Sequence, residues 1–196
     1  MMMGTSVLVD SDDTRYPEIE NFIRDIYQRS YFAKPANLPK KLLAKYSKHG
    51  DLLCAAGLRT PKDGFFSECY LDLPIEQALA SAIGHEVRRA DICEVTSLVS
   101  NSPHETGAFV DDIAAQIAAL GFSWSFYTLT SRLALLLKRK GLSPIDLAPA
   151  EAHRVPSPET WGRYYLTSPR VFAISIEHLR ARTTSPGGTL DHAIAI

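Results

Sequence analysis

The sequence lacks long hydrophobic runs, an excess of charge of either sign, and a basic N-terminal segment. Its longest apolar stretches, such as residues 133–137, fall far short of the ~20 residues that a membrane-spanning helix requires. The formal net charge of −1 gives no general attraction to nucleic acid or to anionic membranes. After residues 7–9 the N-terminus turns acidic, unlike a signal peptide. These absences predict a cytoplasmic protein without a transmembrane segment or a nucleic-acid partner.

Cysteine is also scarce, with three residues in the chain. The number is odd, and Cys54, Cys69 and Cys93 show no Cys-x-x-Cys spacing, which argues against a disulfide framework and against a zinc knuckle. The histidines are not spaced as metal ligands either. A buried free cysteine usually behaves as a small hydrophobe, so a nucleophilic cysteine is the less favoured alternative. We expect neither a metal site nor a disulfide, and a reducing compartment.

The composition is that of a globular protein, with 45% hydrophobic and 22% charged residues. The length of 196 residues suits one domain of ordinary size. We predict a single domain over residues 1–181. Residues 182–196 contain Pro186, Gly187 and Gly188 and little that could pack, so we expect a flexible tail there.

Hydrophobic periodicity and turn residues predict an alternation of strands and helices. The expected strands are residues 41–46, 52–59, 65–71, 92–99, 122–129, 142–147 and 171–175. The expected helices are residues 17–31, a helix opened by Pro74, residues 107–120, 131–140 and 176–181. The predicted fold class is α/β (α+β), with a mixed sheet, an antiparallel N-terminal meander, then βαβα crossovers, and helices on both faces. This layout resembles that of the acyl-CoA N-acyltransferases.

Several short stretches carry a more specific resemblance. The most distinctive is Glu-x-Tyr-Leu-Asp-x-Pro-Ile-Glu over residues 68–76, and strands 53–59 and 92–98 together with segments 142–149 and 161–165 add to it. Together they resemble the thermostable-hemolysin family over residues 16–179. The layout is also similar to GNAT-type N-acetyltransferases and acyl-homoserine-lactone synthases. The resemblance implies transfer of an acyl group from a pantetheine thioester to the amine of a small molecule, in signalling or specialised metabolism.

Acyl transfer to an amine requires a base, and Glu94 is the best candidate. It lies in an apolar strand, where burial would raise its pKa into a useful range. The alternative is a structural carboxylate that holds Arg59. Thr96 follows on the same strand and joins Glu94 as a predicted catalytic residue. A backbone N–H near residues 96–98 would polarise the thioester carbonyl, at a point where we expect the strand to bulge.

The donor side is expected to involve the end of this strand, the next helix start, and one arginine. These thioester- and pantetheine-binding residues are Ser97, Leu98, Val99, Thr106, Gly107, Ala108 and Arg132. The expected loop over residues 100–106 holds Pro103 and Glu105 in place of a glycine-rich phosphate cradle. We therefore favour acyl-phosphopantetheine on an acyl or peptidyl carrier protein over acyl-CoA, with no permanently bound cofactor. Alternatively, this loop is only a helix cap made by Ser102 or Thr106.

The acceptor is expected across the sheet from the donor. The residues predicted to line its site are Arg59, Glu68, Tyr70, Trp161 and Tyr164. Their alternative roles are a surface salt bridge for Arg59 and core packing for the aromatic residues. Many acetyltransferases place a tyrosine general acid where this chain has Leu137, so Tyr127 or Tyr164 could act instead.

Two rival functions stay open. One is a catalytically inactive protein that binds an acyl thioester or a metabolite. The other is a haemolysin-type membrane-active protein, against which the lack of a spanning segment and of a basic amphipathic helix argues. Exposed Tyr27, Tyr31 and Phe32 on the first helix would support a homodimer, unless that helix caps the sheet.

Overall fold

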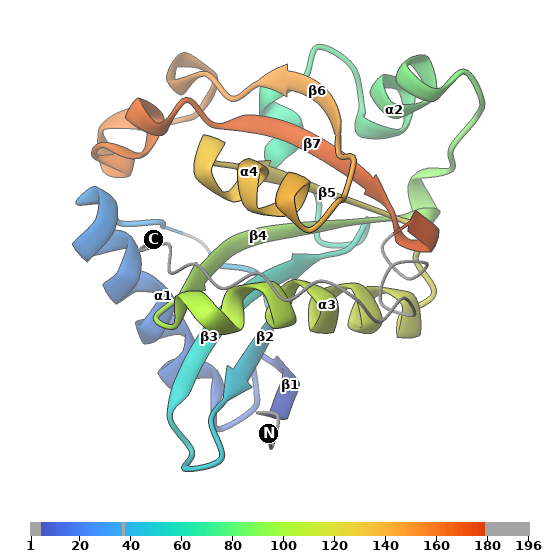
Figure 1. The fold of residues 1–196 in the computed structure, drawn as a ribbon. Coiled ribbons are helices and arrows are strands. Elements are labelled where there is room, and N and C mark those ends of the chain that lie inside the picture. The colour runs from blue at the N-terminus through green and yellow to red at the C-terminus, as the bar shows by residue number, and fades with distance from the viewer. Residues whose placement is uncertain (1–4, 37, 179–196) are drawn as a thin grey trace.

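The computed structural model describes residues 5–36 and 38–178, which form one seven-stranded mixed sheet of order β1-β2-β3-β4-β5-β7-β6 (Figure 1). Strands β1 to β4 are antiparallel neighbours, β4 and β5 are parallel, and β7 runs antiparallel to both β5 and β6. The strands are β1 (Thr5–Asp10), β2 (Lys41–Tyr46), β3 (Leu52–Arg59), β4 (Ile92–Ser100), β5 (Trp124–Leu129), β6 (Ile145–Pro149) and β7 (Arg170–Ser175).

Helices cover both faces of this sheet, as predicted. The α-helices are α1 (Tyr16–Tyr31), α2 (Ile75–Ile83), α3 (Pro103–Ala119) and α4 (Ser131–Arg139). Helices α3 and α4 lie in front of the sheet in Figure 1 and share one core with β3, β4 and β5. Helix α1 packs against the opposite face, and α2 packs on that same face nearer to β6. The fold class inferred from the sequence is therefore confirmed.

Short 3-10 helices connect the larger elements. They are η1 (Ser67–Tyr70), η2 (Arg89–Asp91), η3 (Ala152–Arg154), η4 (Pro158–Trp161) and η5 (Tyr164–Thr167). Segments η4 and η5 form the ordered aromatic stretch between β6 and β7. They lie beside the C-terminal end of α1, where the backbone N–H of Arg163 donates to the carbonyl of Tyr31 at 2.7 Å.

Local sequence explains why α1 forms and how it is placed. Pro17 occupies the first turn, where its missing N–H costs nothing. Ile19 and Ile23 are fully buried against the sheet, so the helix caps it. Tyr27 is only 7% exposed, contrary to the exposure expected of it, whereas Phe32 is 57% exposed. The homodimer stays a prediction.

Two corrections concern strands. The strand expected over residues 65–71 is wrong, because this segment contains η1, and the backbone N–H groups of Phe66 and Ser67 donate to the Glu94 carboxylate. The third strand of the N-terminal meander is instead β1, which pairs with β2. Strand β7 lies between β5 and β6, so the second crossover reaches a strand that is not adjacent to β5.

A further correction concerns the start of α3. The helix begins at Pro103, four residues before the expected Gly107, because proline suits the first helical position. Thr106, Gly107 and Ala108 therefore lie within its first turns and not in a loop. Ser102 occupies the N-cap position but makes no side-chain capping bond, and Thr106 donates its hydroxyl to the Ser102 carbonyl at 3.3 Å. The tail expected over 182–196 lies outside the described residues, and so do residues 179–181 of the helix expected over 176–181, whereas residues 176–178 are helical.

Candidate active site

The parallel strands β4 and β5 separate before either strand ends. Their pairing covers residues 92–95 and 124–127, with Val95 opposite Tyr127 as the last pair. Beyond it, β4 continues to Ser100 along β3, and β5 continues to Leu129 along β7. Two parallel strands that diverge in this way open a split. Along the split between β4 and β5, the two backbones face each other but are not paired.

A β-bulge lies in β4 at the start of this split, as the sequence analysis predicted. Val99 pairs with Ala55 and Thr96 pairs with Gly57, so Ser97 and Leu98 together oppose a single residue of β3. Ser97 has a φ of +53°, in the left-handed region. The bulge shifts the alternation of side chains along β4 by one residue. As a result, Val95 and Leu98 both contact the core under α3, whereas Val99 contacts the core under α1.

On the α3 and α4 side, the split leads to a small apolar cavity of about 10 Å³. Its lining residues are Leu98, Val110, Ile113, Tyr127, Leu129, Leu133, Leu137 and Ile174. Leu137 lies here, and so does Tyr127, whose hydroxyl accepts a hydrogen bond from Ser125 at 2.8 Å. Burial raises the pKa of Tyr127 above its usual value, so the phenol stays protonated. Of the two alternative general acids, Tyr127 is on this side and Tyr164 is on the opposite side.

Glu94 lies on the other face of β4 and has no exposed surface. One carboxylate oxygen accepts the N–H of Phe66 at 2.7 Å, and the other accepts the N–H of Ser67 at 2.8 Å. Burial raises the pKa of Glu94, against the opposing effects of these hydrogen bonds and of the Arg59 charge. Glu94 thus fixes η1 to the sheet, and it is held as a desolvated carboxylate of raised pKa.

Two hydroxyl groups connect Glu94 to the split. Thr128 on β5 donates its hydroxyl to that of Ser67 at 2.7 Å, and the Ser67 side chain acts on Glu94 by lowering the pKa of its carboxyl group. Thr128 is half-buried, one residue beyond the last β4–β5 pair. Sequence reasoning missed both residues. The alternation of side chains along β5 offered a signal for Thr128. Phe126 pairs with Glu94, and Thr128 is two residues later and so lies on the same face of the sheet.

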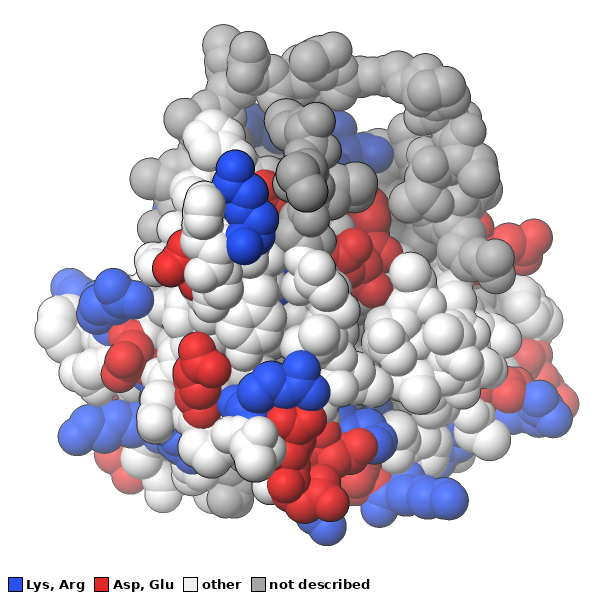
Figure 2. Space-filling model, turned by 90° about the horizontal axis from the view of Figure 1, so that it is seen from below, with Lys and Arg blue, Asp and Glu red and all other residues white. Residues whose placement is uncertain are grey.

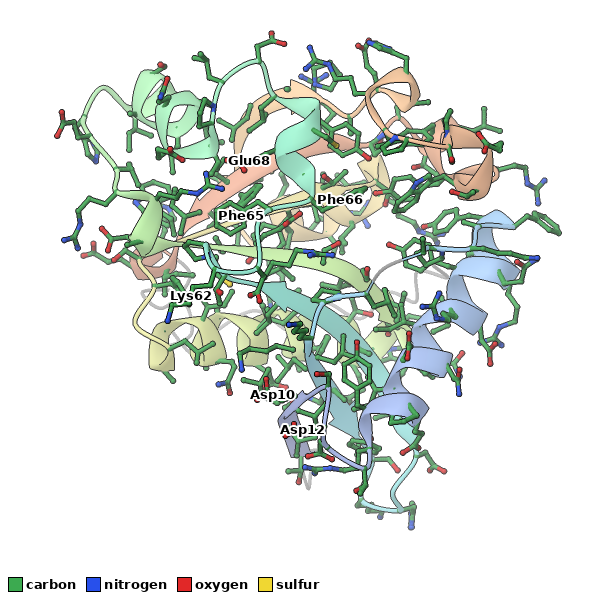
Figure 3. The ribbon with its side chains drawn as sticks, turned by 180° about the vertical axis from the view of Figure 1, so that it is seen from behind. Asp10, Asp12, Lys62, Phe65, Phe66 and Glu68 are labelled. Atoms are coloured by element: carbon green, nitrogen blue, oxygen red, sulfur yellow. The ribbon has the colours of Figure 1, made fainter. Side chains whose placement is uncertain are left out.

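Aromatic rings line the same side of the sheet. They come from α1, from η1 and the residue before it, and from η4 and η5, and they are Tyr27, Tyr31, Phe66, Tyr70, Trp161, Tyr164 and Tyr165. Figure 3 views this side and shows Phe65 and Phe66 on the segment before η1, with Phe66 nearer to η4 and η5. The hydroxyls of Tyr70 and Tyr165 hydrogen-bond at 2.8 Å. We call these seven rings the aromatic wall.

The structure brings some predicted acceptor residues together and leaves one apart. Tyr70, Trp161 and Tyr164 belong to the aromatic wall, and Arg59 lies directly opposite Glu94 in the β3–β4 pairing. Glu68 instead forms a two-pronged ion pair with Arg89, at 2.5 and 2.7 Å, and accepts the N–H that begins α2. Its carboxylate therefore anchors α2 and η2, and Figure 3 shows it on the α2 side of Phe66.

The predicted donor residues are also divided. Ser97, Leu98 and Val99 lie at the split, and burial raises the pKa of Tyr27 while the Ser97 side chain opposes that rise. Arg132 is exposed on the first turn of α4, and its charge acts on Tyr31 of the aromatic wall. The α3 residues Thr106, Gly107 and Ala108 form a separate group.

Charged side chains surround the start of α3. The Gly107 carbonyl accepts a hydrogen bond from Lys140 at 2.9 Å, and Lys140 also pairs with Asp111. Glu105 pairs with the buried Lys45 at 3.4 Å. On the face shown in Figure 2, basic and acidic side chains are interspersed, and neither sign forms a broad patch among the described residues.

The cysteines are unsuited to nucleophilic chemistry. Burial raises the pKa of Cys93 to about 12 and those of Cys54 and Cys69 to about 11, so all three are thiols at neutral pH. Within residues 5–36 and 38–178, no three His, Cys, Asp or Glu side chains are grouped as metal ligands. In the same part of the chain, every helix is too short or too polar to cross a bilayer.

Comparisons with known proteins agree with this fold. A family model described as "Thermostable hemolysin" matches residues 9–179, whereas no curated protein matches the sequence. The acyl-homoserine-lactone synthase LasI has a TM-score of 0.60 at 8% identity, covering 97% of this chain and 100% of its own. BjaI, a CoA-dependent acyl-homoserine lactone synthase solved with SAM and isopentyl-CoA, has a TM-score of 0.59 at 10% identity and coverages of 92% and 87%. FeeM, an N-acyl amino acid synthase from uncultured soil microbes, has a TM-score of 0.57 at 11% identity and coverages of 92% and 97%.

Proposed function

Because this chain belongs to the thermostable hemolysin family and has the fold of N-acyltransferases, we propose that it moves an acyl group from a pantetheine thioester to the amine of a small molecule. The observation that carries the proposal is the bulged split between β4 and β5, placed beside a buried glutamate of raised pKa. The reaction needs both parts: an edge that holds the thioester and a base that takes the amine proton.

In the proposed mechanism, the thioester lies in the split, and the acyl carbonyl accepts a hydrogen bond from a backbone N–H at the bulge, near Ser97 and Leu98. Such a fixed donor stabilises the oxyanion of the tetrahedral intermediate. The amine approaches from the aromatic wall, and Glu94 takes its proton. The thiolate leaves on the α3 and α4 side, where the protonated Tyr127 lies closest among the acid candidates.

For the donor, we favour a carrier-protein thioester over CoA. Pro103 removes one N–H from the first turn of α3, and Glu105 adds negative charge where a pyrophosphate would bind. Lys45 offsets part of that charge but is itself buried between Glu105 and Asp112. The single phosphate of phosphopantetheine needs fewer N–H donors and less positive charge at the N-terminus of α3 than the pyrophosphate of CoA does. The fold also accommodates a CoA donor, since the BjaI structure contains isopentyl-CoA.

The test is a panel of acyl thioesters, each supplied both as CoA and as carrier-protein conjugates, with a broad pool of amines. Thiol release and product masses are followed for the wild type and Glu94→Gln in parallel. We expect release from carrier conjugates that Glu94→Gln abolishes. Release from CoA alone would overturn the donor assignment, and no release from any donor would overturn the function.

One observation favours a second candidate, a binding protein without turnover. Both oxygens of Glu94 are already occupied by backbone N–H groups, which is the arrangement of a purely structural carboxylate. In that case acyl-carrier or acyl-CoA binding would be measurable by calorimetry while product formation is absent. The membrane-active alternative is tested in the same experiments by the release of dye from liposomes without donor.

A further inference from the structure

The Glu94 carboxylate cannot contact an amine directly. Its side chain has no exposed surface, and the N–H groups of Phe66 and Ser67 hold its two oxygens. If Glu94 is the base of the proposed acyl transfer, on which this inference rests, a proton must reach it through another group. A general base works either at hydrogen-bonding distance or through an intermediary that can accept and donate a proton.

The hydroxyls of Ser67 and Thr128 form such an intermediary. Ser67 is 1% exposed, its backbone N–H donates to one Glu94 oxygen at 2.8 Å, and its side chain lowers the pKa of that carboxylate, toward which the hydroxyl can only donate when Glu94 is ionised. Its oxygen then accepts from Thr128, and that hydrogen bond is 2.7 Å long. Proton donation therefore runs one way, from Thr128 at the split through Ser67 toward Glu94. The Thr128 oxygen keeps a lone pair for an incoming N–H.

Thr128 is well placed at the outer end of this chain. It follows Tyr127, the last residue of β5 that pairs with β4, and it lies on the face of Glu94 and the aromatic wall. Its half-buried side chain contrasts with the full burial of Ser67 and Glu94. An amine that attacks a thioester in the split from this face passes the Thr128 hydroxyl before any carboxylate.

We propose that Thr128 and Ser67 relay the proton of the attacking amine to Glu94. As the C–N bond forms, the amine proton passes to Thr128, the Thr128 proton to Ser67, and the Ser67 proton to the carboxylate. Both hydroxyls end neutral, and Glu94 ends as a carboxylic acid. The tetrahedral intermediate then breaks its C–S bond, and the thiolate takes the electron pair. Return of the proton from Glu94 along the same hydroxyls to solvent restores the ionised base.

The experiment compares Thr128→Val, Thr128→Ser and Ser67→Ala with the wild type. Thr128→Val keeps the shape of the side chain and removes the hydroxyl, whereas Thr128→Ser keeps it. Ser67→Ala retains the backbone N–H that holds Glu94. The control is Ser81→Ala, which removes a hydroxyl on α2, outside the split and the aromatic wall, where it donates to the Gln77 carbonyl at 2.9 Å.

We expect kcat to fall by about 100-fold in Thr128→Val and Ser67→Ala, the size of a lost proton-transfer step, with the KM for the donor unchanged. Thr128→Ser and Ser81→Ala should keep wild-type kcat. The kinetic isotope effect in mixtures of light and heavy water provides a second readout. When several protons move in one step, the rate depends on the deuterium content of the solvent along a curve. We expect a curve for the wild type and a straight line for Thr128→Val.

The outcomes separate this proposal from the one on which it rests. Turnover by the wild type, with kcat and curvature retained in a folded Thr128→Val protein, would overturn the relay and leave the acyltransferase proposal intact. Absence of turnover from every donor would overturn both. If Ser67→Ala fails to fold, the pair Thr128→Val and Thr128→Ser still decides, because Thr128 is half-buried and its variants keep the packing of β5.

Discussion

Arg59 and Glu94 are direct partners across the antiparallel pairing of β3 and β4, next to the point where β4 bulges. The Arg59 charge lowers the pKa of Glu94, whereas burial, the larger effect, raises it. The same guanidinium also lowers the pKa of Asp63 in the turn that follows β3. The Arg59 charge therefore acts on two carboxylates and favours the ionised form of each, in Glu94 against the larger effect of burial.

Replacement of Glu94 should separate its structural role from its chemical role. Glu94→Gln keeps one acceptor oxygen for the two N–H groups of η1, so we expect a loss of about 1–3 kcal/mol in unfolding free energy for the group left unsatisfied. Glu94→Ala removes both acceptors and should cost more. Loss of the base should lower kcat by at least about 100-fold in folded Glu94→Gln protein. Urea unfolding and turnover measure the two effects, and a Glu94→Gln protein with wild-type kcat would contradict the assignment.

The raised pKa of Glu94 predicts that stability and activity change oppositely with pH. A folded-state pKa above the unfolded value means that the folded protein binds the proton more tightly. The stability from Glu94 is thus fully present below the unfolded pKa of about 4.3 and is lost as pH rises through the folded pKa. Activity needs the ionised form, so it should rise over the same window.

Glu94→Gln provides the control for this pH dependence. The difference in unfolding free energy between wild type and Glu94→Gln should shrink as pH rises, and a difference independent of pH would contradict the raised pKa. The titratable and charged groups that act on Glu94, or on which it acts, are Arg59, Cys69 and Cys93. The two thiols have pKa values of about 11 and about 12, so they do not titrate in this window.

The sequence was informative where a residue type conflicts with its surroundings. The single carboxylate in the apolar run of residues 92–99 predicted a special role for Glu94, since a buried charge needs partners. The hairpin of β2 and β3 followed from alternation around a glycine turn, and its expected bounds agree with the structure. The bulge in β4 was expected from the fold, and Ser97 lies in it with a positive φ.

Other features have no local signature. Ser67 and Thr128 are ordinary hydroxyl residues, and only the parallel register of β4 and β5 reveals that they reach Glu94. Residues 65–71 look like a strand because they are aromatic and apolar, but the demand of a buried carboxylate for two N–H donors turns the backbone into η1. The start of α3 was misplaced because Pro103 was taken as a loop residue when it opens the helix.

Gly162 is expected to be essential for the placement of the aromatic wall. Its φ is +51°, and a Cβ there would approach the Phe32 carbonyl oxygen to 2.6 Å and would also contact the Tyr31 carbonyl oxygen. Gly162→Ala must therefore push η4 and η5 away from α1. The matched control is Gly50→Ala in the β2–β3 turn, where φ is +88° but nothing lies within 4 Å of the added carbon.

Both glycine variants carry the backbone strain of alanine at positive φ, about 1 kcal/mol. We expect Gly162→Ala to lose more than Gly50→Ala and to raise the KM for the amine, because Trp161 and Tyr164 move. Melting temperatures and acceptor saturation curves measure these effects. Equal destabilisation in the two variants, with unchanged acceptor KM, would show that the wall tolerates displacement.

Variants of Ser97 test whether the acyl thioester is held by the bulged backbone and not by the Ser97 side chain. At a φ of +53°, serine bears a strain of order 1 kcal/mol that glycine does not, so we expect Ser97→Gly to be at least as stable as the wild type. Valine is β-branched and strongly disfavoured in this region. Ser97→Val should therefore be less stable than Ser97→Gly by about 2 kcal/mol, or lose the bulge.

Loss of the bulge would shift the faces of Leu98 and Val99 and withdraw the N–H groups from the split. We thus expect Ser97→Gly to retain kcat/KM for the donor, and any folded Ser97→Val protein to lose most of it. Thr5→Val, on the exposed edge strand β1, controls for the effect of valine on a strand of the same sheet. A Ser97→Val protein with wild-type kcat/KM would mean that the thioester carbonyl is polarised elsewhere, because valine cannot keep the backbone in its present conformation without strain.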